Sequence, residues 1–229
     1  TMSAMVHVFD PQINTIPPVC QNAQPFAFSA NLPGGIWSGN GIVNSNTGLF
    51  SPANASIGLN QINHNLPGLC QVTDTIQVNP LPVADAGAYY SNCHILDTTI
   101  GVNPIAGHSY SWSPSTHLSN DSISNPNFYF ENLSQTNATF PYVLTVTIDS
   151  SGCSDTASTQ MIVIPRPIVY AGADTAYCDN DLLVLSGSGA NTYVWNNGIL
   201  NNVPFIQNIG TVTYTVLGTD LLGCFDSDS

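Results

Sequence analysis

One pattern of cysteine, tryptophan and cysteine occurs three times along the chain, and it constrains the fold more than any other feature. Its members, in order, are Cys20, Trp37, Cys70; Cys93, Trp112, Cys153; and Cys178, Trp195, Cys224. Proline-rich segments at residues 79–82 and 164–167 separate the three copies. The sequence therefore predicts three domains, at residues 11–82, 83–167 and 168–229, with residues 1–10 belonging to the last strand of a preceding domain.

The residues between these markers predict β-strands and no helix. Segments such as residues 142–148 and 211–217 are alternating or β-branched, and Gly, Pro, Asn and Ser clusters separate them. Only 7% of the residues are charged and none is Lys, so the charged residues typical of exposed helices are missing. The predicted class is all-β: three tandem immunoglobulin-like β-sandwiches, each with a core tryptophan (Trp37, Trp112, Trp195) and one disulfide.

The pattern predicts that each domain closes its own disulfide. The expected bonds are Cys20 to Cys70, Cys93 to Cys153 and Cys178 to Cys224, because small sandwiches bury limited surface and benefit from a covalent link. A zinc site built from these cysteines and some of the five histidines is the alternative, but no metal-binding spacing is present. Disulfides of this kind predict an extracellular protein, either secreted or on the cell surface.

Charge and motif content exclude several functions. The net charge is −13 with a single basic residue, Arg166, so no surface can bind a nucleic-acid backbone or an anionic membrane. No apolar run is long enough for membrane insertion. Titratable residues are spread over three small modules without a nucleophile or metal motif, so we predict no catalytic residues and no enzyme activity.

The repeats resemble a known family. Residues 84–87 (Ala-Asp-Ala-Gly), Trp112 with the following Ser-Pro, the strand at 142–148 and residues 151–156 are similar to tandem PKD-like and immunoglobulin-like repeats. Such repeats occur in secreted or cell-surface adhesins of Bacteroidetes, including gliding adhesins exported by the type IX pathway. Residues 34–41 and 47–52 of the first copy resemble a sister variety. The resemblance implies surface display and adhesion but names no ligand.

The sequence also contains candidates for two further kinds of site, O-glycosylation and calcium binding. Asp followed by Ser or Thr resembles the O-glycosylation signal of that phylum, which makes candidate acceptors of Thr75, Thr98, Ser122, Thr156 and Thr175. The alternative is that Asp-Thr pairs simply suit strand entries. Asp85 and Asp174, near the domain junctions, are weak candidates for calcium, and turn capping by these residues is favoured over it. No other metal or cofactor is expected.

The two ends of the sequence look complementary. The third repeat stops soon after Cys224 and lacks a last strand, whereas residues 4–11 read like residues 160–165, which are a last strand and its proline. The candidate donor strand consists of Ala4, Met5, Val6, His7, Val8 and Phe9. We expect it to complete the third domain of a preceding unit, through a covalent array of 229-residue periods or through strand exchange between chains. The rival expectation is that these residues add a first strand to domain one.

Together these observations predict a non-catalytic segment of a long repetitive surface protein. Its domains would form a semi-rigid rod or filament for adhesion, gliding or cell-surface structure, with identical repeats or chains as head-to-tail partners and surface glycans as a further ligand class. The alternative is a carbohydrate-binding accessory region of a secreted hydrolase. In that case exposed aromatic residues such as Tyr89, Tyr90 and Tyr170 would stack on sugars.

Overall fold

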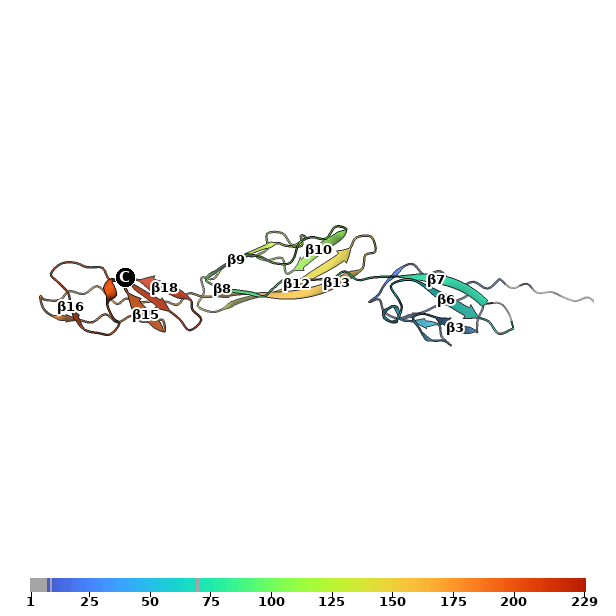
Figure 1. Ribbon diagram of the computed structural model, residues 1–229, viewed down its shortest axis with the longest axis horizontal. Helices are drawn as coiled ribbons and strands as arrows, with labels where there is room; N and C mark the ends of the chain where they lie inside the picture. Colours follow the sequence, from blue (N-terminus) through green and yellow to red (C-terminus); the bar gives the residue numbers. More distant parts are fainter. Residues whose placement is uncertain (1–7, 9, 69–70) are drawn as a thin grey trace, which may run out of the picture.

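The chain folds into β-strands and two single-turn 3-10 helices, arranged as three units in a row (Figure 1). The computed structural model describes residue 8, residues 10–68 and residues 71–229. Each unit contains two sheets and its own cluster of buried hydrophobic residues. This is the predicted all-β, immunoglobulin-like class, whereas the exact domain limits remain predictions.

Unit 1 contains seven strands. They are β1 (Val19–Cys20), β2 (Phe26–Ala27), β3 (Ile36–Gly39), β4 (Ile42–Asn44), β5 (Leu49–Phe50), β6 (Gly58–Asn65) and β7 (Gln71–Asn79), with the 3-10 turn η1 (Pro52–Asn54) after β5. One sheet has the order β1-β7-β6-β3 and the other β2-β5-β4. The strand β1 runs parallel to the end of β7, with Cys20 opposite Asn79. Trp37 is buried between the sheets and stacks on His64 at a ring distance of 4.1 Å.

Unit 2 contains six strands. They are β8 (Tyr90–Cys93), β9 (Ile95–Thr99), β10 (His108–Ser113), β11 (Asn127–Glu131), β12 (Ala138–Ile148) and β13 (Ser154–Ile164). The sheet β10-β12-β13-β8 packs with the pair β11-β9 around ten buried hydrophobic residues, Trp112 among them. As in unit 1, the first strand is parallel to the end of the last one, with Cys93 opposite Ile164. Units 1 and 2 therefore share one topological feature that places their first cysteine.

Unit 3 has a smaller core. Its strands are β14 (Leu182–Leu183), β15 (Thr192–Trp195), β16 (Phe205–Ile206), β17 (Val216–Thr219) and β18 (Phe225–Asp228), with η2 (Asn196–Gly198) after β15. They form the sheets β14-β16 and β15-β17-β18. Only Val169, Trp195 and Val216 make up its buried cluster, against ten residues in unit 2. Unit 3 thus lacks much of the apolar packing that its neighbour has.

The strand predictions are confirmed in unit 2 and need two corrections in unit 3. Residues 142–148 lie within β12, but of residues 211–217 only Val216 and Leu217 lie in a strand, β17. The last strand of the third repeat, expected to be missing, is present as β18 and pairs with β17. It is four residues long, whereas β13 has eleven. The prediction that the third repeat lacks its last strand was therefore wrong, because the four-residue strand β18 occupies that place.

Candidate functional site: the junctions between units

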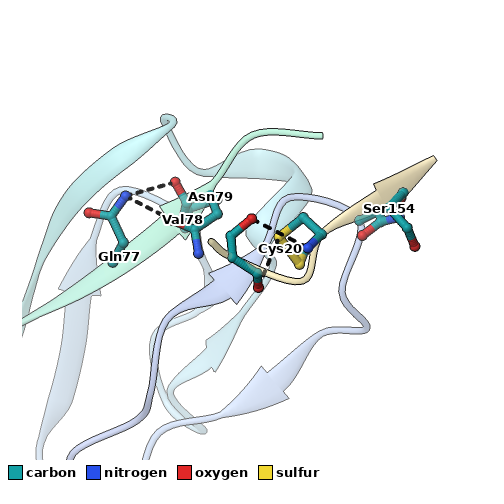
Figure 2. The surroundings of a disulfide bond; sticks show 8 residues. Cys20, Gln77, Val78, Asn79 and Ser154 are labelled. Atoms are coloured by element: carbon teal, nitrogen blue, oxygen red, sulfur yellow. Dashed lines mark hydrogen bonds between the residues drawn. A yellow bond between two sulfur atoms is a disulfide. The ribbon is translucent and has the colours of Figure 1, made fainter. Parts of the chain in front are cut away.

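A disulfide joins unit 1 to unit 2. Cys20, the last residue of β1, bonds Cys153, which directly precedes β13, with a Cα–Cα distance of 5.5 Å. Figure 2 shows Cys20 near the end of β7, where the Gln77 side chain hydrogen-bonds the Asn79 side chain at 3.2 Å. The Asn22 amide also donates to the backbone carbonyl of Ser154 across the junction, at 3.3 Å. The bond is therefore part of a contact between the facing ends of two units.

The junction between units 2 and 3 repeats this arrangement. Cys93, the last residue of β8, bonds Cys224, which directly precedes β18, again with a Cα–Cα distance of 5.5 Å. The only basic side chain, Arg166 in the linker, lies 3.7 Å from the Asp226 carboxylate of unit 3. Both groups are more than a third exposed, so the ion pair contributes little beside the covalent bond. In both junctions the first cysteine of one unit bonds the second cysteine of the next.

These bonds overturn the predicted pairing within each repeat. In unit 2, Cys93 lies opposite the last residue of β13 and Cys153 lies just before its first residue. An extended strand of this length spans roughly 35 Å, far beyond the reach of a disulfide. The two cysteines of unit 2 thus lie at opposite ends of the unit, and each bonds a cysteine of a neighbouring unit.

The two disulfides do not include Cys178 or Cys70. Cys178 is exposed and forms no disulfide with the described residues, so the predicted bond to Cys224 was wrong. Cys70 lies outside the described residues. The predicted bond from Cys20 to Cys70 was wrong, because Cys20 bonds Cys153.

Two covalent connections between neighbours restrict their relative motion. A flexible linker alone allows bending and twisting, whereas a second attachment point across the same junction removes most of that freedom. The bonds span 133 and 131 residues of sequence. In the chain-entropy model a loop of this length stabilises the folded state by about 5 kcal/mol. The junctions are therefore built to hold units in line as well as to stabilise them.

A cavity of about 730 Å³ lies at the Cys178 end of unit 3, beside residues 171–178, which carry no strand. Residues 207–214 and Trp195 also line it. Tyr177 and Ile209, both more than half exposed, are among the lining residues. No sequence signal locates this cavity, because its lining comes from segments that lie far apart in the sequence.

The tryptophans, the glycosylation candidates and the calcium candidates all lie in the described part of the chain. All three tryptophans are buried, which confirms their core role. Of the five candidate glycosylation residues, Thr98 is half-buried and the others are exposed: Thr75, Ser122, Thr156 and Thr175. The Asp85 carboxylate accepts a hydrogen bond from the Gly87 amide at 2.8 Å, as a turn cap does, while Asp174 lines the cavity. In the described part of the chain no three His, Cys, Asp or Glu side chains gather as a metal site.

The predicted donor strand lies almost entirely outside the described residues. Ala4, Met5, Val6, His7 and Phe9 belong to the part that is not described, and only Val8 can be assessed. Its side chain is 90% exposed, so it does not pack into unit 1. The rival expectation, an added first strand of domain one, gains no support from Val8.

Comparisons with known proteins are limited to distant structural likeness. No protein-family model matches the sequence, and no curated protein matches it either. The chain is similar to domains 3–5 of Drosophila OTK, at 12% identity over 93% of this chain and 92% of that one, with a TM-score of 0.38. It is also similar to the insect immune protein hemolin, at 13% identity, 95% and 74% coverage and a TM-score of 0.34.

Drosophila N-cadherin EC1–4 gives 12% identity, 95% and 73% coverage and a TM-score of 0.33. Scores this low carry no residue roles, ligand or activity to this chain, and the fold class rests on its own sheets and cores. Within the described residues there is no helix with the length and apolar character needed to cross a bilayer.

Proposed function

We propose that the chain is a non-catalytic, rod-forming segment of an extracellular surface protein that serves adhesion or cell-surface structure. The observation that carries this proposal is the pair of disulfides that cross the junctions between units. A covalent bond at each junction suits a protein that must keep a binding surface at a distance and transmit force along its axis. Disulfides also persist in an oxidising, extracellular environment.

The shape of the oxidised and reduced protein tests this proposal. Small-angle scattering should give one narrow distribution of maximum dimensions for the native chain. The double variant Cys20→Ser/Cys153→Ser removes one junction bond without leaving a reactive thiol, and it should broaden that distribution while the circular dichroism of the strands stays unchanged. A native chain as flexible as the variant would contradict the rod.

Glycosylation belongs to the same proposal. Four of the five candidate hydroxyls are exposed, at Thr75, Ser122, Thr156 and Thr175, as a glycan acceptor requires. Protein from its native source should exceed the sequence mass of 24.2 kDa, with hexose-containing mass on these residues. An unmodified mass of native material would remove the idea.

No observation favours the carbohydrate-binding alternative. Tyr89 and Tyr170 are each 56% exposed, but neither packs against another aromatic ring among the described residues. A glycan array distinguishes the two functions, because a sugar-binding module should lose its signal when Tyr89, Tyr90 and Tyr170 are replaced by alanine. The rod predicts no such dependence.

A further inference from the structure

One face of unit 2 carries rows of hydroxyl groups. The strands β10, β12 and β13 are neighbours in one sheet (Figure 1). Leu144 and Val146 of β12 are buried in the core, so Thr145 between them points to the outer side of the sheet. Ser111 of β10 and Thr156 of β13 lie directly opposite Thr145. Three hydroxyl side chains therefore form one row across the outer face.

The same alternation repeats this row along the strands, about 7 Å further in each direction. The outer positions around Val143 are eight Ser and Thr residues, which we call the hydroxyl face: Ser109, Ser111, Ser113, Thr145, Thr147, Ser154, Thr156 and Ser158. All eight are exposed or half-buried. Ser154 and Thr156 form hydrogen bonds only through their backbone groups. Within the described residues none of the eight hydroxyl groups has a hydrogen-bond partner, so all are available to an outside one.

The acidic residues of unit 2 lie away from the hydroxyl face. Asp97 and Glu131 belong to the other sheet, on β9 and β11. Asp155 lies opposite the buried Val146 and therefore on the core-facing side of β13. The other three lie outside strands: Asp85, Asp121 and Asp149. Two chains of net charge −13 repel each other, but on this face they can meet without bringing carboxylates together.

The corresponding face of unit 1 shows what distinguishes the hydroxyl face. Asn63 of β6 lies opposite Ser38 and Thr73 there. Its side-chain oxygen accepts hydrogen bonds from the Thr73 hydroxyl at 2.9 Å and from the Gln61 amide at 3.3 Å. These polar groups of unit 1 bond one another, whereas in the described structure the hydroxyl groups of unit 2 do not.

We propose that the hydroxyl face of unit 2 packs against the same face of a second copy of this chain, so that two copies associate side by side. Every hydroxyl group is both a donor and an acceptor, so two identical hydroxyl faces are complementary to each other. Short side chains also allow two sheets to stack about 10 Å apart. The contact is isologous, because each copy contributes the same residues. It lies within one unit, so it does not depend on the junction disulfides.

The residues of this face favour a second copy over a sugar polymer. A sugar-binding face commonly offers an aromatic ring on which a sugar stacks, and the outer positions of β10, β12 and β13 hold none. The face is only three strands wide, so a single contact is small and weak. Copies that are held in parallel on a surface gain affinity by making many such contacts at once.

Amide chemical shifts at rising protein concentration test where two copies meet. Free thiols are blocked with iodoacetamide without reduction, so the junction bonds stay and no covalent dimer forms. From roughly 0.05 to 1 mM chain, the amides of Ser111, Thr145 and Thr156 should shift, whereas those of β9 and β11 should not. Shifts confined to other surfaces, or no shifts at all, would overturn the proposed contact.

Salt provides a second test of the same contact. The Debye length falls from about 10 Å at 0.1 M salt to about 3 Å at 1 M, which screens the repulsion between two acidic copies. The dissociation constant from the shift titration should therefore fall several-fold at the higher salt concentration. A contact held by ion pairs would weaken instead, and that result would contradict an uncharged interface.

A charged substitution tests the hydroxyl face directly. Thr156→Asp places a carboxylate on each of the two packed faces and should raise the dissociation constant at least about tenfold. Thr99→Asp is the matched control, because it makes the same change at an exposed threonine of β9, in the other sheet. Ser111→Asp repeats the test from β10, and circular dichroism checks that each variant is folded. Equal weakening by Thr156→Asp and Thr99→Asp would show that net charge, and not this face, controls association.

The neutral glucan cellohexaose tests the other occupant. If it shifts the amides of Ser111, Thr145 and Thr156 while protein concentration does not, the face binds sugar and the proposed contact between copies is wrong. Protein without glycans is used throughout, because a sugar attached to Thr156 would stand on the hydroxyl face and block the contact.

Discussion

Each of the three tryptophans is held by a different set of polar and aromatic contacts. The Trp112 indole nitrogen donates to the Ile123 carbonyl at 2.9 Å, and that of Trp195 donates to the Asn201 side chain at 3.0 Å. Trp37 instead stacks between His64 and Phe28. The repeat pattern predicted that all three would be buried, but it could not predict these partners, because they come from segments of unlike sequence.

The Tyr142 side chain should make unit 2 sensitive to alkaline pH. It is almost fully buried and donates a hydrogen bond to the Thr116 carbonyl, and burial raises the pKa of Tyr142 from 10.0 to about 12. Its contribution is complete below pH 10, the unfolded value, and is lost as pH rises towards 12. The loss amounts to about 2–3 kcal/mol of unfolding free energy.

Denaturant unfolding between pH 9 and 12 measures this effect. The Tyr142→Phe variant cannot ionise at this position, so its stability should fall less steeply over the same range. Tyr129→Phe is the control, because Tyr129 is 51% exposed and its removal should leave the pH slope unchanged. Identical slopes for the native chain and Tyr142→Phe would contradict the assignment.

Asn132 should be the most costly asparagine to replace in unit 2. Its amide donates to the Thr136 carbonyl at 2.8 Å and to the Val163 carbonyl at 2.7 Å, and its side-chain oxygen accepts from Ser134. Asn132→Ala removes all three hydrogen bonds, including the buried one to the Val163 carbonyl, and should cost about 2–3 kcal/mol. Asn137→Ala, at an exposed site nearby, should stay within about 0.5 kcal/mol. Thermal and urea unfolding of both variants decides the matter, and equal stabilities would contradict the buried network.

At the scale of elements, two turns of unit 2 meet too closely for a side chain. Gly101 has a φ of +76°, and a Cβ there would lie 2.1 Å from the Ser124 carbonyl oxygen and 2.9 Å from the Trp112 ring. Gly101→Ala should therefore destabilise the unit by on the order of 3 kcal/mol. Gly107 has a φ of +74° with nothing within 4 Å, so Gly107→Ala isolates the backbone cost of about 1 kcal/mol. If urea unfolding shows the same loss of stability for both variants, the contacts of a Cβ at position 101 with Ser124 and Trp112 do not destabilise the unit.

The strands could be predicted from sequence where alternation is long. Residues 142–148 and 160–164 form parts of β12 and β13 as expected. Residues 211–215 have the same β-branched character, yet they form no strand. Residues 211–214 line the cavity of unit 3, and the Thr215 amide donates to the Asn196 side chain rather than to a strand. Local propensity predicts strands only where the sheet provides a partner.

At the scale of the whole molecule, the cysteine pairing could not be predicted from spacing. Each repeat contains two cysteines and one tryptophan, and this pattern suggested a disulfide within each sandwich. The register of β8 on β13 decides otherwise, because it places the two cysteines of unit 2 at opposite ends of the unit. Separate cores do not conflict with bonds between units, since the bonded cysteines lie outside the three core clusters.

The crossed bonds should limit how far the chain extends under force. Fully reduced, 229 residues extend to roughly 800 Å. With both bonds intact, the shortest covalent path runs from Cys20 through Cys153 back to Cys93 and on to Cys224, which limits the extension to roughly 300 Å. Single-molecule pulling with and without a reductant measures the difference. Equal lengths in the two conditions would show that these bonds are absent.

Peptide mapping without reduction tests the central claim, that neighbouring units are joined by disulfides, most directly. Trypsin is unsuitable because Pro167 follows the only basic residue, Arg166, so pepsin and an Asp-specific protease should be used. The linked peptides should contain Cys20 with Cys153 and Cys93 with Cys224. Peptides that link Cys20 with Cys70 and Cys93 with Cys153 would contradict it.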